Sequence, residues 1–235
     1  MKTRDEYLDY VRSDACDLTT EPDRAVVYAN DKFDGHHRNM ERAQAAGTTI
    51  EQTPGGEFLD KQELFKNLES TDADIVWHEA SHKFASSVSG DVTTRVIGAA
   101  EDSAFRQVEL PTLLANDKVT AINGVPREEL KSLFEKDPEA AFNKVCESEL
   151  AHSRLQVQGT NDPAALADLE HRSQRFAQQI EEQQKQNPQR TLQNASQPIE
   201  PQNAEVFELK QPPPPPPPPT KPVELNKASD EAITQ

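Results

Sequence analysis

The apolar residues of this chain recur at helix or strand spacing up to about residue 157, whereas beyond residue 186 they are isolated among Gln, Asn, Pro and Glu. A segment that cannot gather apolar surface cannot offset the entropy lost on folding. The pattern therefore predicts one folded domain at 1–157, a helical extension at 158–185 and a disordered Pro/Gln-rich tail at 186–235.

The first half of the domain is predicted to be mostly helical. Its elements are, in order, a strand at 25–28, a helix at 35–46, an irregular loop at 49–56, a helix at 60–69 and a helix from about 72 to 88. The loop is predicted because Pro54 is followed by two glycines. The start of the last helix is predicted from Thr71 and Asp74, which form a T-x-x-D capping pattern before an apolar run.

The second half has the pattern of an α/β fold. Runs of β-branched residues at 92–97 and 119–122 predict buried strands. Pro126 and Pro138 suit the first turn of a helix, and the second of these helices is expected to reach about Leu155. Strands alternating with helices predict a small parallel sheet, so the fold class is α/β with a mostly helical first half.

The extension carries a stripe of apolar residues spaced three and four apart, which predicts a helix over about 163–185. The stripe consists of Leu166, Leu169, Phe176 and Ile180. Because Ser173 interrupts it and only two heptads are present, the pattern does not indicate a coiled coil. We expect a helix that docks on its own domain or frays into solvent.

The tail contains eight consecutive prolines, the first Pro212 and the last Pro219. Such a segment forms an extended polyproline II helix without hydrogen bonds of its own. Profilin, SH3 and WW domains bind helices of this kind in aromatic grooves, and a stiff spacer is the alternative role.

Composition and charge exclude several classes of partner. The chain has 235 residues, 18 prolines and a formal net charge of -16, so we expect neither nucleic acid nor an anionic membrane surface to bind it. The N-terminus lacks the apolar core of a signal peptide, and synthesis as a soluble cytoplasmic chain is expected. Cys16 and Cys146 lie far apart and are interpreted as reduced thiols.

The stretch WHEASHKFA at 77–85 contains H-E-x-x-H, in which a helix presents two imidazoles and a carboxylate to zinc. With about 100° per residue, His78 and His82 lie opposite the apolar face of such a helix, and we expect them to face water. A third ligand is missing in its usual forms, since only Glu101, in a loop, is available. A zinc metalloprotease remains an alternative function, and no metal is predicted otherwise.

The opposite face of this helix belongs to a longer pattern in three blocks. The blocks are T-I-E-Q-T at 49–53, W-x-x-x-S-x-x-F-A at 77–85, and Gly90-Asp91-Val92 with Gly98, Ser103-x-Phe105-x-x-Val108-Glu109, Leu113 and Val119. In order and spacing they resemble the ADP-ribosyl cyclase / NAD glycohydrolase family, over about residues 25–125. The resemblance implies one ADP-ribosyl cyclase-like catalytic domain that cleaves the nicotinamide–ribose bond of NAD, its substrate, without a cofactor.

The resemblance also implies roles for individual residues. Glu109 matches the catalytic glutamate, Glu51 the glutamate that contacts the nicotinamide carboxamide, and Trp77 the tryptophan that stacks on nicotinamide. Tyr28 stands where the family has a second stacking tryptophan. Ser81, Ser103 and Phe105 match residues near the phosphates and ribose. From the residues alone, Trp77 could equally be a core residue and Glu109 a surface acid at a strand end.

Several positions depart from the family. Ala29-Asn30 replaces the usual Ser-Arg at the diphosphate, so Lys32 or Arg106 is the expected phosphate contact. Gln52 replaces the Asp that follows the signature glutamate, and two cysteines cannot reproduce the disulfides of extracellular members. With Glu51 retained, hydrolysis to ADP-ribose is expected to exceed formation of cyclic ADP-ribose.

An NAD glycohydrolase harms the cell that makes it. We therefore expect a toxin or effector that is delivered into a target or host cell, with an immunity protein in the producer. The alternative from another class is a non-enzymatic adaptor whose function is the polyproline segment.

Overall fold

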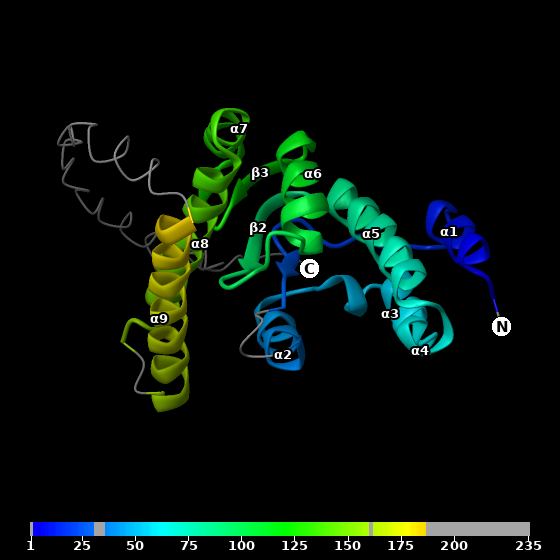
Figure 1. Ribbon diagram of the computed structural model, residues 1–235, viewed down its shortest axis with the longest axis horizontal. Coiled ribbons are helices and arrows are strands. Elements are labelled where there is room, and N and C mark those ends of the chain that lie inside the picture. Colours follow the sequence, from blue (N-terminus) through cyan, green and yellow to red (C-terminus); the bar gives the residue numbers. More distant parts are fainter. Residues whose placement is uncertain (1, 31–35, 160–161, 187–235) are drawn as a thin grey trace, which may run out of the picture. The chain divides into compact units, whose positions relative to one another are not determined.

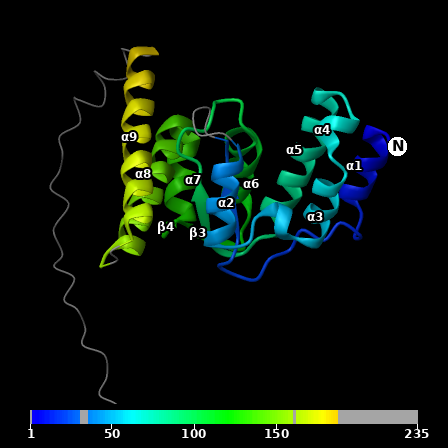
Figure 2. The ribbon, with the colours of Figure 1, turned by 90° about the horizontal axis from the view of Figure 1, so that it is seen from below.

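The computed structural model describes residues 2–30, 36–159 and 162–186 (Figures 1 and 2). The predicted tail from residue 187 onward, including the prolines from Pro212 to Pro219, lies outside the described residues, as does Lys32. No helix of the described part is long and apolar enough to cross a membrane.

A four-stranded sheet combines one strand from the first half of the domain with three from the second, and its order is β1-β2-β3-β4. The strands are β1 (Val26–Tyr28), β2 (Gly90–Arg95), β3 (Val119–Ile122) and β4 (Val125–Pro126). The first three are parallel, and β4 runs antiparallel to β3. Asn123 and Gly124 join this last pair with φ angles of 49° and 80°, the left-handed conformations that a two-residue hairpin turn requires. The α/β class is confirmed, although the sequence did not predict β4.

The first half is mostly helical, as predicted. It contains α1 (Arg4–Arg12), α2 (His36–Ala46), the 3₁₀ turn η1 (Ile50–Gln52), α3 (Pro54–Lys61), α4 (Leu64–Asn67) and α5 (Ser70–Ser87). The predicted loop at 49–56 is wrong, because Pro54 is the first residue of α3 and Thr53 caps it by accepting from the Gly56 N–H at 3.2 Å. Glycine is needed at 56 for close packing, since a Cβ there would lie 1.8 Å from the Ile50 carbonyl oxygen.

Two helix boundaries also differ from the prediction. The single helix expected at 60–69 is interrupted at Glu63, whose φ is 47°. Helix α5 begins at Ser70, before the predicted cap at Thr71, and Glu69 is its N-cap without a side-chain hydrogen bond. Helix ends commonly differ by one or two residues from the positions that a capping pattern indicates.

The remaining helices are the π-helical turn η2 (Phe105–Glu109), α6 (Leu110–Ala115), α7 (Arg127–Lys136), α8 (Pro138–Val157) and α9 (Pro163–Gln186). Of these, the sequence predicted α7, α8 and α9 but not η2 and α6. Figure 1 shows α8 and α9 on one side of the sheet and α5 and α6 on the other. Helix α9 packs along α8, so the docked helix predicted for the extension is confirmed.

Candidate functional site

A cavity of about 570 Å³ lies along β1 and its carboxyl end, the place where open parallel sheets commonly bind ligands. Its lining comes from β1 and the two residues after it, α2, η1, α3, α4, α5 and the segment 100–109. The structure brings all seven predicted site residues into this lining: Tyr28, Glu51, Trp77, Ser81, Ser103, Phe105 and Glu109. They come from separate parts of the chain, and only the tertiary fold makes them neighbours.

Glu109 ends the π-helical turn η2 and is almost completely buried, with 5% of its surface exposed. The alternative interpretation as a surface acid at a strand end is therefore wrong. Its Oε2 atom has no hydrogen-bond partner among the described residues. Burial raises the pKa of Glu109 to about 8, contact with the Ser81 hydroxyl opposes the shift, and the nearby charge of Glu51 adds to it. A buried carboxyl group with one unsatisfied oxygen is thus part of the cavity lining.

Glu51 is the second carboxyl group inside the cavity, and Tyr28 orients it. The Tyr28 hydroxyl donates to Glu51 Oε1 at 2.6 Å. Burial, followed by the charge of Glu51, raises the pKa of the Tyr28 hydroxyl far above its ordinary value, so this hydroxyl stays a donor at any physiological pH. Oε2 of Glu51 is buried and has no partner among the described residues. The lining of the cavity therefore holds two carboxyl groups, each with one buried oxygen that no described residue satisfies.

Helix α5 supplies the aromatic part of the lining. Val76, Ala80 and Phe84 are fully buried and fix the helix against the core. Trp77 is only partly buried, packs against that core and lines the cavity, so it is more than a core residue. Its indole, the Tyr28 ring and the His78 imidazole are the aromatic groups of the described lining that carry a polar atom.

The two histidines of the H-E-x-x-H motif separate in the structure. His82 is exposed, as predicted, but the prediction for His78 is wrong, because it is partly buried and lines the cavity. The cavity covers a wider arc of α5 than the apolar stripe does, and His78 lies one turn before Ser81 within that arc. Glu79 accepts from Arg12 at 2.7 Å instead. Within the described ranges no group of three or more His, Cys, Asp or Glu side chains could hold a metal ion.

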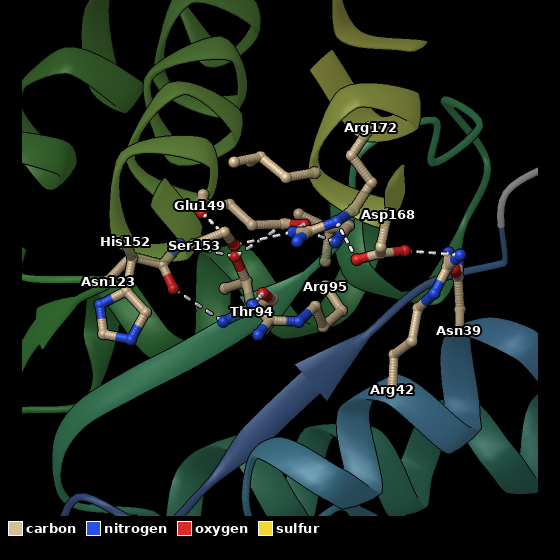
Figure 3. A network of polar contacts seen from close by, with 12 residues as sticks. Asn39, Arg42, Thr94, Arg95, Asn123, Glu149, His152, Ser153, Asp168 and Arg172 are labelled. Atoms are coloured by element: carbon tan, nitrogen blue, oxygen red, sulfur yellow. Dashed lines mark hydrogen bonds and ion pairs between the residues drawn. The ribbon is translucent and has the colours of Figure 1, made fainter. Parts of the chain in front are cut away.

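A buried polar network holds the segment that leads from β2 to Glu109. Glu149 of α8 is 1% exposed, and its Oε2 accepts from the Val96 N–H at 2.7 Å. Burial raises the pKa of Glu149, and the neighbouring charges of Arg95 and Arg172 oppose that shift. Figure 3 shows Arg172 of α9 between Glu149 and Asp168, at 3.4 Å and 2.9 Å. Helix α9 is therefore part of the support of the site.

The same segment is attached at two further points. The Gly98 N–H donates to Gln179 of α9 at 3.1 Å. Arg106 forms an ion pair with Glu139 of α8, and its guanidinium lies over the Phe142 ring at 4.4 Å. Arg106 is thus absent from the cavity lining, and its predicted phosphate contact is wrong. The pairing with Glu139 joins residues 33 positions apart, which no local pattern indicates.

The sequence did not predict several lining residues. Asp60, Asp74 and Asp102 are exposed acids of the lining, and Phe65 of α4 is 57% exposed. Of these residues, only Asp74 could have been placed in the lining from the local sequence, because it lies one helical turn before His78 on the side of α5 that meets the cavity.

Comparisons of the chain with protein-family models, with curated proteins and with solved structures found no match. The resemblance to the ADP-ribosyl cyclase / NAD glycohydrolase family therefore stays a prediction, and a functional proposal has to rest on the geometry of the cavity.

Proposed function

We propose that this chain is an NAD glycohydrolase that cleaves the bond between nicotinamide and ribose. The observation that carries the proposal is Glu109, a buried carboxyl group with a free oxygen in a cavity that also holds an indole and a second carboxyl group. Cleavage of this bond passes through an oxocarbenium-like transition state, and a carboxylate near the ribose stabilises the positive charge.

The chemistry needs little general acid. When the bond between C1′ of the ribose and the pyridinium nitrogen breaks, its electron pair goes to the nitrogen and nicotinamide leaves as a neutral base. Water then adds to C1′ and loses a proton, so the products are nicotinamide, ADP-ribose and one proton. In this mechanism Glu109 is the carboxylate beside the ribose, Trp77 stacks on the departing ring, and Glu51 contacts its carboxamide or accepts the proton of the attacking water.

The raised pKa of Glu109 is compatible with this role. In the empty cavity the carboxyl group is mostly neutral at pH 7, because its pKa is about 8. A bound pyridinium cation favours the ionised form, since an opposite charge nearby lowers the pKa of a carboxyl group. Substrate binding thus creates the carboxylate that the reaction requires.

The family-level features remain part of the proposal. They are an ADP-ribosyl cyclase-like domain, hydrolysis in excess of cyclisation, and delivery as a toxin or effector with an immunity protein in the producer. Loss of NAD harms the cell in which the enzyme acts, and this harm supports delivery of the enzyme into another cell.

The test is to incubate the purified full chain with NAD and to separate the products by chromatography. We expect nicotinamide and ADP-ribose in equal amounts, a small yield of cyclic ADP-ribose, and a loss of at least about a hundredfold in rate for Glu109→Gln, the size expected when a group that stabilises transition-state charge is removed. Glu147→Gln, at an exposed acid of α8, is the matched control and should retain the rate. A wild-type chain that releases nicotinamide neither from NAD nor from nicotinamide riboside would refute the proposal and favour the polyproline adaptor.

A further inference from the structure

The mouth of the cavity carries an excess of negative charge. Asp60 of α3, Asp74 of α5 and Asp102 of the segment before η2 are all exposed and all line the cavity. The three residues share no helix or strand, so three different parts of the fold bring carboxylates to the same opening. We call these three residues the acidic rim.

No lysine or arginine belongs to the described lining, where His78 is the one basic side chain. Two arginines of the surrounding elements are engaged with acids of α8 and α9. Arg106 pairs with Glu139, and Arg42 of α2 pairs with Asp168 of α9 at 2.6 Å, as Figure 3 shows. Within the described lining, therefore, no lysine or arginine neutralises the negative charge of the acidic rim.

The interior of the cavity is built for a ligand. Only 5% of the surface of Glu109 is exposed, and one of its oxygens has no partner among the described residues. A cation that enters would lie near the carboxyl groups of Glu109 and Glu51 and near the rings of Trp77 and Tyr28. Aromatic faces and carboxylates both attract cations, and the attraction grows as water is excluded.

From these observations we infer that the preferred substrates are N-ribosyl pyridinium cations that carry few or no phosphate groups, and that a dinucleotide such as NAD is a poorer substrate. The inference rests on the proposed cleavage of the nicotinamide–ribose bond. A riboside has a net charge of about +1 and is attracted along the whole path past the acidic rim. The diphosphate of NAD must lie at or beyond the opening, where the carboxylates of the rim repel it.

The bond chemistry is the same for each substrate. The C1′–N bond breaks with its electrons on nicotinamide, a new C1′–O bond forms to water, and one proton is released. Only the group on the 5′ carbon of the ribose differs: a hydroxyl, a phosphate or an adenosine diphosphate. A comparison of the three substrates therefore isolates the effect of phosphate charge from the effect of the chemistry.

The experiment measures kcat/KM of the full chain for nicotinamide riboside, nicotinamide mononucleotide and NAD, by release of nicotinamide. At low ionic strength we expect the riboside to exceed NAD by at least about tenfold, a size within the range of electrostatic steering. Added salt should lower kcat/KM for the riboside and raise it for NAD, because screening weakens attraction and repulsion alike.

Variants of the acidic rim give the internal control. Asp60→Asn and Asp74→Asn should each lower kcat/KM for the riboside and raise it for NAD, about twofold to fivefold per charge. Glu147→Gln removes one charge on α8 and should change neither value. If NAD is cleaved as fast as the riboside or faster, this inference is overturned alone. If none of the three substrates is cleaved, the proposed function is overturned with it.

Discussion

Replacement of Glu109 by glutamine is expected to stabilise the protein at neutral pH, although it removes the proposed catalytic group. Burial gives the folded state a pKa of about 8 at this position, against an ordinary value of 4.5. Between these values the folded state binds more protons than the unfolded state, so the wild-type chain loses stability as the pH rises through this window. Glutamine has no proton to lose and is free of this penalty.

The size of the effect follows from the two pKa values. One unit of pKa shift corresponds to about 1.4 kcal/mol, so the stability of Glu109→Gln relative to wild type should increase by about 2–3 kcal/mol between pH 5 and pH 7. A comparison of two pH values cancels the pH-independent effects of the substitution, such as a changed contact with Ser81. Above about pH 8 the difference should level off, because both states of the wild-type chain are then ionised.

Urea unfolding at pH 5, 6, 7 and 8 measures this difference. Trp77 is the single tryptophan of the chain and lines the cavity, so its fluorescence reports the transition. Glu147→Gln controls for the loss of one formal charge at an exposed position. A stability difference between Glu109→Gln and wild type that stays constant from pH 5 to pH 8 would refute the effect of burial.

Three further substitutions test other contacts of the structure. Tyr28→Phe removes the hydroxyl that donates to Glu51 at 2.6 Å. The rate of nicotinamide release should fall about tenfold, which is the effect of losing one hydrogen bond to a charged group. An unchanged rate would contradict a role of this hydroxyl in orienting Glu51. Arg172→Met leaves the buried carboxyl group of Glu149 without its ion-pair partner on α9. The free energy of unfolding, measured in urea, should fall by about 3–5 kcal/mol. A decrease below about 1 kcal/mol would mean that this contact of α9 contributes little to stability. Gly56→Ala places a Cβ 1.8 Å from a backbone oxygen of η1 and should lower the free energy of unfolding by more than about 2 kcal/mol, and an unchanged midpoint would contradict the close packing there.

The sequence predicted those parts of the fold that depend on local pattern. The β-branched run of β3 and the apolar stripe of α9 lie where they were expected, because strand and helix periodicities are properties of neighbouring residues. The segment after Thr53 was misassigned for the opposite reason. Pro54 suits the first turn of a helix as well as a loop, and the close contact that requires Gly56 comes from η1, which is formed by the fold.

The sequence predicted seven residues of the cavity lining, but it predicted few of the residues that surround them. The spacing of Trp77 and Ser81 on one helix identified part of the cavity, but the width of the cavity, which includes His78, depends on α3, α4 and β1. The burial of Glu109 depends on the π-helical turn and on packing against distant elements. The Glu149 network could not be predicted, because its partners lie on separate helices and strands.

The proposed role of the Glu109 carboxylate, stabilisation of the ribosyl cation, should be visible in the dependence of kcat/KM on pH. Because kcat/KM reports ionisation of the free enzyme, nicotinamide release should rise with pH and level off above about pH 8, the pKa that burial gives Glu109. Glu109→Gln should abolish both the activity and the rise, while Glu147→Gln keeps the wild-type profile. A Glu109→Gln variant that releases nicotinamide at the wild-type rate would contradict this role.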